Sequence, residues 1–385
     1  MDTNFAIEKK LFSIDLKNIQ DDFVDIKSSP LSYKVLFMPT IANINQHYKN
    51  KYLIEKQNRF IIWDENVFNL YGKSLIVLND TKFVLSAIEE NKCIDTVLEL
   101  IDKLQNISLT KKELIVSIGG GITQDITAFT RAIYKRGIDW SFIPTTLLSM
   151  ADSCIGAKTA LNHKAVKNQL ALFSAPKEVI VCPEFLNSLS SDEIFSGYGE
   201  ILKLVIIGGE IAINEFEKII NSKREDNQII VALIKLSLHI KKLVIEEDEF
   251  ELNLRRSLNY GHTFGHAIEP LVDYKVPHGI AVSIGMIIEN RLSSIYGKLD
   301  VTISENYNML IAKYIPAKYW TYIATINHEK LLMNIFQDKK TMQNTINMAV
   351  PFNTNEFGIL KIDKTEFTIP FIKGLLNQVL AEYAK

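Results

Sequence analysis

The sequence lacks several features of secreted, membrane and metal-thiolate proteins. It has only three cysteines in 385 residues, Cys93, Cys154 and Cys182, and their spacing does not suit a metal site. So few cysteines, in an odd number, favour a reducing cytoplasm over a disulfide framework. No window approaches ~18 uncharged apolar residues, and the N-terminus has no basic segment followed by an apolar core. We therefore expect a cytoplasmic protein without a membrane partner.

The chain also lacks an excess of charge of either sign. Lys+Arg number 43 against 45 Asp+Glu, which gives a formal net charge of −2. The chain therefore has no global basic field, and we expect no nucleic-acid partner. An anionic small molecule would have to be held by local cations. The length and a hydrophobic fraction of 47% are sufficient for two domains with separate cores.

The hydrophobic pattern changes near residue 185. Before it, short apolar runs alternate with helical patterns, which is typical of a mostly parallel sheet covered by helices. After Pro183 most of the chain has a 3.6-residue period, beginning at Ser190-Ser191-Asp192-Glu193, which has the form of a helix start. We predict a Rossmann-like α/β domain over residues 1–185 and a mainly α-helical domain over residues 186–385.

The first domain should contain short buried strands. We predict them at 60–63, 74–78, 114–118, 140–143 and 179–181. The part before residue 55 is ambiguous, and an antiparallel pair is one interpretation of it.

A glycine triplet, Gly119-Gly120-Gly121, lies between the strand predicted at 114–118 and a segment of helical periodicity. Glycines in such a turn bring backbone N–H groups against a pyrophosphate at a helix N-terminus. A tight turn without a ligand would explain the triplet alone equally well. Asp125, which we expect in the first helical turn, and the motifs that follow it favour a dinucleotide site.

The motifs that follow resemble those of the dehydroquinate synthase family, the sugar phosphate cyclases. In order they are GGGxxxD at 119–125, Arg136-Gly137, PTTLL at 144–148, Asp152-Ser153, GxKT at 156–159, Asn162 and Lys167-Asn168. The match continues well beyond Asn168, so the resemblance is specific.

The resemblance implies an NAD site at the carboxyl ends of the strands, where ligands collect in open α/β sheets. Asp64 and Asn66 would contact the adenosine half of NAD, although an ordinary Asp-containing turn is the alternative. Lys92 fits the family spacing, but the residues before it depart from the usual motif. The remaining implied cofactor residues are Gly119, Gly120, Gly121, Asp125, Thr145, Thr146, Asp152 and Lys167.

Three histidines and a glutamate in the second domain suit a divalent metal ion such as Zn²⁺ or Co²⁺. Because His262 and His266 are four residues apart, spacing alone favours them as a ligand pair. The resemblance instead implies Glu200, His262 and His278 as ligands, with His266 in proton transfer and phosphate contact. Core histidines, and a Glu200–Lys203 pair on a solvated helix face, are the simpler alternatives.

The resemblance further implies that a phosphorylated seven-carbon keto-acid sugar is converted to a carbocycle, with loss of phosphate and transient oxidation by NAD. The implied substrate-binding residues are Arg136, Asp152, Lys158, Asn168, Lys241, Arg255, His266 and Lys340, or Lys339 in its place; those implied in catalysis are Lys158, Lys167, Lys203, Asn259 and His266. A charged, exposed face is the alternative for the stretch 241–259. In relatives the position of Arg136 reaches the neighbouring subunit, which implies a homodimer.

The substrate is less well defined than the family, because Gln124, Ala157 and Ala171 depart from its usual residues. Arg255 favours a substrate with a carboxylate, and His266 argues against valiolone-type synthases. We therefore expect dehydroquinate formation in the shikimate pathway of aromatic amino acid biosynthesis. A specialised cyclase of the 2-deoxy-scyllo-inosose, sedoheptulose 7-phosphate or amino-dehydroquinate type is the second hypothesis, and a metal-dependent polyol dehydrogenase is the third.

Overall fold

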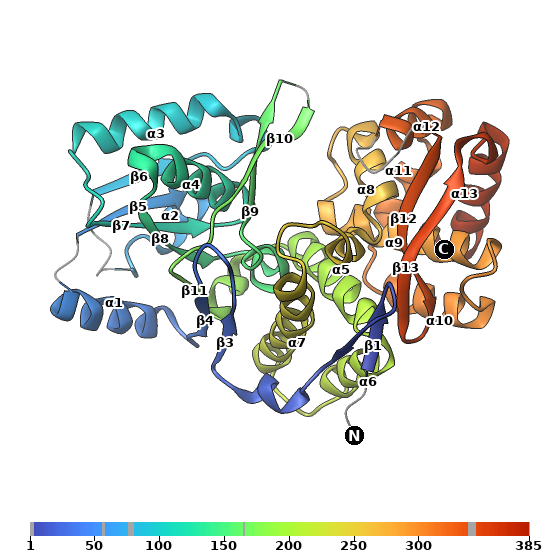
Figure 1. Ribbon diagram of the computed structural model, residues 1–385, viewed down its shortest axis with the longest axis horizontal. Helices are drawn as coiled ribbons and strands as arrows, with labels where there is room; N and C mark the ends of the chain where they lie inside the picture. The colour runs from blue at the N-terminus through green and yellow to red at the C-terminus, as the bar shows by residue number, and fades with distance from the viewer. Residues whose placement is uncertain (1–3, 56–57, 76–80, 165, 338–343, 385) are drawn as a thin grey trace. The chain divides into compact units, whose positions relative to one another are not determined.

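The computed structural model describes residues 4–55, 58–75, 81–164, 166–337 and 344–384 (Figure 1). The chain forms two compact units, of which one is Gln20–Leu189 and the other joins Met1–Ile19 to Ser190–Lys385. This division differs from the expected one at the N-terminus. There β1 (Asn4–Ile7) pairs with β13 (Glu356–Asp363), so the first residues belong to the second unit.

The unit Gln20–Leu189 is built on a seven-stranded sheet in the order β3-β4-β11-β8-β7-β5-β6. All neighbouring strands in it are parallel except β3 and β4, so the predicted α/β class with a mostly parallel sheet is confirmed. The strands are β3 (Phe23–Ile26), β4 (Tyr33–Phe37), β5 (Arg59–Asp64), β6 (Thr81–Leu85), β7 (Leu114–Gly119), β8 (Asp139–Pro144) and β11 (Glu178–Val181).

One strand prediction in this unit lies mostly outside the described residues. Ser74, at the start of the strand predicted for 74–78, lies in a turn, and residues 76–78 are outside the described part of the chain. The described strand β6 (Thr81–Leu85) alternates little between buried and exposed residues, as expected for a strand at the sheet edge.

Helices and a hairpin surround this sheet. The helix α3 buries Val97, Leu100 and Leu104, a spacing that places them on one face. The hairpin of β9 (Lys158–His163) and β10 (Val166–Phe173) packs against α4 (Figure 1). The helices are α1 (Ile41–Glu55), α2 (Glu65–Tyr71), α3 (Ile94–Asn106) and α4 (Gly121–Ile133).

The second unit is mainly helical, as predicted, and its first helix begins where the sequence indicated. Ser190 caps α5 and forms a capping box with Glu193. The helices are α5 (Ser191–Ile207), α6 (Gly209–Ile220), α7 (Asp226–Glu247), α8 (His262–Ile268), α9 (His278–Ile295), α10 (Val301–Ala312), α11 (Ala317–Ala324), α12 (His328–Gln337) and α13 (Ile369–Tyr383). None of the helices in the described ranges is long and apolar enough to span a bilayer.

A four-stranded sheet in the second unit was not predicted. Its order is β12-β13-β1-β2, and it combines β12 (Thr345–Asn353) and β13 from the end of the chain with β1 and β2 (Lys10–Ser13) from its start. The strand β1 is parallel to β13 and antiparallel to β2. Pairing between strands so far apart in sequence leaves no local pattern from which it could be predicted.

A buried carboxylate ties α1 to the seven-stranded sheet. The oxygens of Glu178, at the start of β11, lie 3.3 Å from His47 Nε2 and 2.8 Å from Lys51 Nζ, and Ser141 Oγ donates to Oε1 at 3.3 Å. Burial by itself raises the pKa of Glu178. The hydrogen bond from His47 and the charge of Lys51 outweigh burial and lower this pKa to about 2.

Glu178 should therefore make the protein sensitive to acid. Because its folded-state pKa is below the ordinary 4.5, its stabilisation is present above about pH 4.5 and is lost as the pH falls toward 2. We expect Glu178→Gln to lower the free energy of unfolding by roughly 2–3 kcal/mol at neutral pH and to weaken its acid dependence. Denaturant unfolding at neutral pH measures the first effect, and a series of unfolding curves from neutral pH down to about pH 2 measures the second. Asp139→Asn, at an exposed ion pair with Lys177, is the control; equal acid dependence of wild type and Glu178→Gln would contradict the prediction.

Candidate active site

Two glycines allow the backbones of α5 and α9 to touch. A Cβ added at Gly199 would lie 2.1 Å from Gly279 O, and one added at Gly279 would lie 1.8 Å from Ser196 O. Gly279 N also donates to Ser196 Oγ at 3.0 Å. Only glycine fits such an approach. The contact brings Glu200, which follows Gly199, close to His278, which precedes Gly279.

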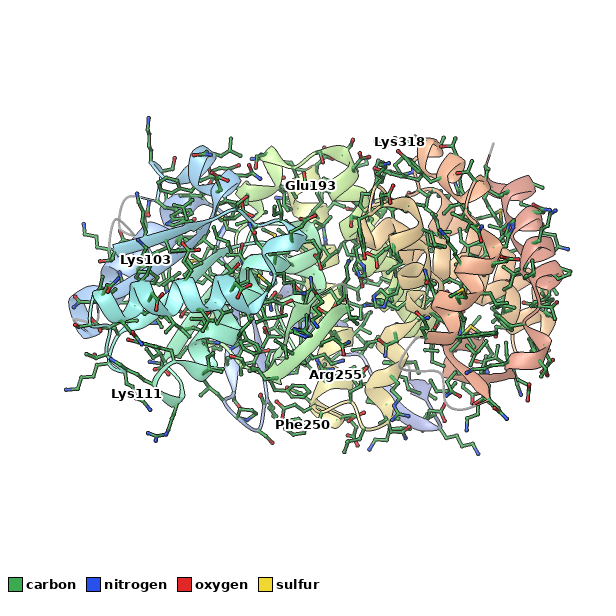
Figure 2. All side chains as sticks on the ribbon, turned by 90° about the horizontal axis from the view of Figure 1, so that it is seen from above. Lys103, Lys111, Glu193, Phe250, Arg255 and Lys318 are labelled. Carbon is green, nitrogen blue, oxygen red and sulfur yellow. The ribbon has the colours of Figure 1, made fainter. Side chains whose placement is uncertain are left out.

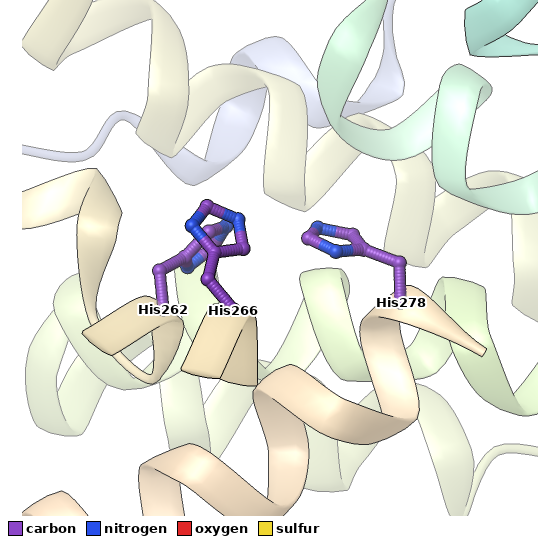
Figure 3. Close-up of side chains that lie close together, drawn as sticks. All are labelled: His262, His266 and His278. Carbon is purple, nitrogen blue, oxygen red and sulfur yellow. The ribbon is translucent and has the colours of Figure 1, made fainter. Parts of the chain in front are cut away.

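Glu200, His262 and His278 converge at this crossing. Glu200 Oε1 lies 3.2 Å from His278 Nε2 and 3.8 Å from His262 Nε2. Figure 3 shows the imidazoles of His262 and His266, from α8, opposite that of His278, at the start of α9. An ion with four ligands in tetrahedral geometry and bonds of ~2.1 Å separates its ligand atoms by roughly 3.4 Å. The distances from Glu200 Oε1 to the two imidazole nitrogens are close to this value.

The other ring nitrogens of two of these histidines each face an oxygen. His262 Nδ1 lies 3.0 Å from Tyr260 O, and His278 Nδ1 lies 3.2 Å from Glu269 Oε1. Such contacts fix an imidazole with Nδ1 protonated and Nε2 directed at a metal. The buried Glu269 was not predicted from the sequence, where its signal was an acid next to an apolar helical run.

His266 lies beside these donors. His262, His266 and His278 each offer a ligand atom, and these atoms lie within 4.8 Å of one another. The pair favoured by spacing, His262 and His266, is therefore also close in space, with ring centroids 5.1 Å apart. However, His266 is exposed, whereas His262 and His278 are half-buried and lie 3.8 Å and 3.2 Å from Glu200 Oε1. Their burial and these distances favour Glu200, His262 and His278 as the ligand set.

The protonation of His278 reflects its two carboxylate neighbours. Burial lowers the pKa of His278, but hydrogen bonds to Glu200 and Glu269 and their negative charge raise it to about 10. A metal ion binds only the neutral imidazole, so binding of an ion here would release a proton.

A lysine lies at the carboxylate of this cluster, and two further cations are buried on elements that pack against α5. Lys203 Nζ is 2.5 Å from Glu200 Oε2, and the two side chains are only 4% and 3% exposed. The alternative of an ion pair on a solvated helix face is therefore wrong. Lys241 and Arg255 are also buried, on α7 and on the 3-10 helix η7 (Leu254–Asn259), both of which pack against α5. The exposed-face alternative is wrong for both.

The segment before Arg255 is organised by hydrogen bonds. Asp248 accepts the backbone N–H of Arg255 at 3.0 Å, and the guanidinium of Arg255 donates to Glu249 O. Asn259 Nδ2 donates to Glu251 Oε1 at 2.9 Å. Figure 2 labels Arg255 in this segment, together with Phe250, whose side chain is exposed.

In the α/β unit, the glycine turn lies at the carboxyl edge of the sheet. A Cβ added at Gly119 would lie 3.0 Å from Asp64 Cβ, and Thr145 N donates to Gly119 O at 3.0 Å. A Cβ added at Gly120 would lie 3.2 Å from Thr146 Cγ2. The chain changes direction across the sheet here, because β6 and β7 lie on opposite sides of β5. Such switch points bind ligands in open α/β sheets.

Asp64 has a clear local role. Its side chain caps α2 by accepting the N–H groups of Asn66 at 2.8 Å and Val67 at 3.3 Å. This is the ordinary Asp-containing turn that was the alternative to contact with NAD. Contact of Asp64 and Asn66 with a cofactor stays a prediction, as it does for Gly121, at the start of α4, and for the buried Asp152.

Lys92 joins α4 to the β9–β10 hairpin. Its Nζ lies 2.5 Å from Asp125 Oδ2 and donates to Asn168 Oδ1 at 2.9 Å. Asp125 Oδ1 also accepts the N–H of Ala160 at 3.3 Å. Burial raises the pKa of Asp125, and Lys92 opposes that rise. We expected Asp125 in the first helical turn. Because α4 begins at Gly121, Asp125 instead follows that turn.

The remaining predicted residues are more exposed. Lys158 lies at the exposed start of β9, and Lys167 Nζ is 3.7 Å from Glu89 Oε1. Arg136 is exposed, with a left-handed φ of 61°. Lys339 and Lys340 lie outside the described residues.

Family models match most of the chain. The 3-dehydroquinate synthase N-terminal model matches residues 82–196, and the C-terminal model matches residues 197–341. A 3-dehydroquinate synthase from Prochlorococcus marinus (strain MIT 9215) is 35% identical over 333 residues, which cover 83% of this chain and 90% of that protein. The chain belongs to the dehydroquinate synthase family. It is therefore a lyase-type enzyme, and the resemblance noted from its motifs is confirmed.

Solved structures share the fold of this dehydroquinate synthase family chain. A 2-deoxy-scyllo-inosose synthase complexed with carbaglucose-6-phosphate, NAD⁺ and Co²⁺ aligns with a TM-score of 0.78 at 18% identity, over 92% of this chain and 99% of that one. A 2-epi-5-epi-valiolone synthase from Streptomyces hygroscopicus subsp. jinggangensis 5008, with NAD⁺ and Zn²⁺ bound, aligns at 0.75 and 22% identity, over 92% and 99% of the two chains.

The two possible histidine sets give opposite results on mutation. We expect His278→Ala to lose stoichiometric Zn²⁺, because it removes a donor held by Glu269, and His266→Ala to retain it. Metal content after dialysis against Zn²⁺, measured by mass spectrometry, tests this. His328→Ala, at the start of α12, is a matched control. Retention of metal by His278→Ala with loss from His266→Ala would favour the pair chosen by spacing.

Proposed function

We propose that this chain is a 3-dehydroquinate synthase that converts a phosphorylated seven-carbon keto-acid sugar to a carbocycle with elimination of phosphate. The observation that carries this proposal is that a buried cation, Lys203, lies beside the convergent donors. Glu200 Oε1 faces both imidazoles, and Lys203, on the same helix, is buried against Glu200. A metal site beside a buried cation suits a substrate that has both hydroxyl oxygens and negative charge.

The sites fit two cofactors. Bound NAD would accept a hydride from a substrate alcohol and later return it, and bound Zn²⁺ or Co²⁺ would polarise substrate oxygens. The start of α4 would present its N–H groups to the pyrophosphate, since Gly120 and Gly121 carry no side chain there. The residues that would contact NAD are Asp64, Asn66, Lys92, Gly119, Gly120, Gly121, Asp125, Thr145, Thr146, Asp152 and Lys167.

The remaining polar residues divide by the part of the substrate that they would bind. Arg255 would bind the carboxylate through two parallel N–H···O bonds, and Lys241 would add a point charge. Lys203 and Lys167 would stabilise negative charge that develops next to the ketone, and His266 would transfer a proton. The phosphate would contact Arg136, Lys158, Asn168 and His266, with Asp152, Asn259 and Lys340 completing the site.

We further propose a cytoplasmic homodimer. Arg136 is exposed and is held in a left-handed conformation next to Gly137, with a φ of 105°. A side chain presented in this way would suit a site in the neighbouring subunit, as the position does in relatives. Light scattering of the purified protein measures the oligomeric state.

A specialised cyclase is the second candidate because of two residues near the predicted cofactor and phosphate sites. Gln124 Nε2 donates to Ser153 O at 2.8 Å, and Ser153 Oγ donates to Gln124 Oε1 at 2.8 Å, so the larger side chain is built into the fold. Ala157 has a φ of 57°, where the family commonly has glycine. Assays with several sugar phosphates distinguish the two candidates.

Turnover should release phosphate without accumulating NADH, because the hydride taken from the substrate is returned within the same cycle. The measurement is inorganic phosphate and absorbance at 340 nm during turnover with NAD, Zn²⁺ and the keto-acid sugar phosphate. A chelated sample without added metal is the control and should be inactive. Steady growth of the NADH absorbance would favour the polyol dehydrogenase.

Arg255 should determine the preference for a carboxylate. We expect Arg255→Ala to weaken transition-state binding by about 2–5 kcal/mol, since the partner charge would be buried. This loss corresponds to a kcat/KM that is lower by roughly 30-fold to several thousand-fold. Arg255→Lys should also lower kcat/KM, because an ammonium group cannot form the two parallel bonds.

The control for Arg255 is its neighbour. Arg256 is exposed, so Arg256→Ala should leave kcat/KM unchanged. With a substrate that lacks the carboxylate, the difference in kcat/KM between wild type and Arg255→Ala should be much smaller. Equal kinetics of wild type and Arg255→Ala on the keto-acid phosphate would remove the reason for preferring dehydroquinate synthesis to a specialised cyclase.

A further inference from the structure

Another buried carboxylate, Glu289, lies on α9, whose first residue is His278. Glu289 is 0% exposed. Its Oε2 accepts the N–H of Gly261 at 2.7 Å, and its Oε1 accepts those of Thr263 at 3.1 Å and Phe264 at 3.3 Å. A carboxylate is costly to bury unless it is hydrogen-bonded, and these three bonds supply that compensation.

The three donors surround one residue of the candidate metal centre. Gly261 and Thr263 are the neighbours of His262, and their N–H groups bond to different oxygens of Glu289. The backbone is therefore held on both sides of His262. Gly261 has a left-handed φ of 77°, and a Cβ added there would lie 2.5 Å from Val282 O, so this turn also packs tightly on α9.

The next residue of α9 extends the same support. Asn290 is 0% exposed and accepts the hydroxyl of Tyr260 at 2.5 Å, while its Nδ2 donates to Asn308 Oδ1 at 2.9 Å. The backbone carbonyl of Tyr260 is the oxygen that faces His262 Nδ1 at 3.0 Å. Asn290 thus fixes the residue that orients the imidazole, and Glu289 fixes the peptide groups that carry it.

We propose that Glu289 and Asn290 are positioning residues for the metal ligand His262. Together they set the direction of His262 Nε2 toward Glu200 Oε1 without touching the metal or the substrate. An apolar side chain at position 289 would fill the same buried space at a lower cost in folding free energy than a buried charge. Stability alone therefore does not account for Glu289. This inference rests on the metal centre of the proposed function.

The test is the affinity of chelator-treated protein for Co²⁺ alone, measured by titration of its visible absorption. In Glu289→Gln, an amide NH₂ replaces one acceptor and faces a backbone N–H group. We expect the Kd for Co²⁺ to rise by roughly 10–100-fold, as for loss of other groups that orient metal ligands, and the absorption band to change shape. Tyr260→Phe, which removes only the hydroxyl bonded to Asn290, should raise the Kd by a smaller factor.

A control separates positioning from general loss of stability. Val379→Ala creates a cavity under α13, where Val379 is 0% exposed, and should lower the melting temperature while leaving the Kd for Co²⁺ unchanged. An unchanged Kd in Glu289→Gln with a lower melting temperature would overturn the inference. If Glu289→Gln does not fold, an unchanged Kd in Tyr260→Phe would overturn it. Failure of the wild-type protein to bind Co²⁺ would overturn the metal centre itself.

Discussion

The backbone contact between α5 and α9 is the constraint on which the candidate metal centre depends. Gly199 and Gly279 have no side chains, so the two helices approach until one backbone touches the other. Glu200 and His278 are the adjacent residues, and their donor atoms meet because the crossing is this close. A wider crossing, of the kind that ordinary side chains require, would separate the donors by more than one metal ion can bridge.

Burial of charge is the second theme of the helical unit. The chain has a formal net charge of only −2, yet Glu200, Lys203, Lys241, Arg255 and Glu289 are all buried in one unit. Each such group must be compensated by an opposite charge or by hydrogen bonds. The unit therefore places its charges in the interior, where they act more strongly on one another than they would in water.

Local patterns allowed much of this protein to be predicted from its sequence. The glycine turn after β7, the capping box of α5 and the histidines of α8 depend on neighbouring residues, and each is found where it was expected. The four-stranded sheet could not be predicted, because β1 and β13 lie at opposite ends of the chain. Glu289 could not be recognised either, since its partners are backbone N–H groups of another helix. Sequence spacing could not decide which histidines bind the metal, because His266 is close to both other histidines.

The pairing of β1 with β13 has a consequence for the order in which the protein can be built. The strand β1 is synthesised long before β13, which begins only at Glu356. All strands of the seven-stranded sheet lie within Gln20–Leu189, so that unit can fold while synthesis continues. The β1–β2 hairpin must wait until β13 has been made, and a hairpin alone is at best marginally stable in water. Completion of the smaller sheet is therefore a high-contact-order step that comes after the seven-stranded sheet can form.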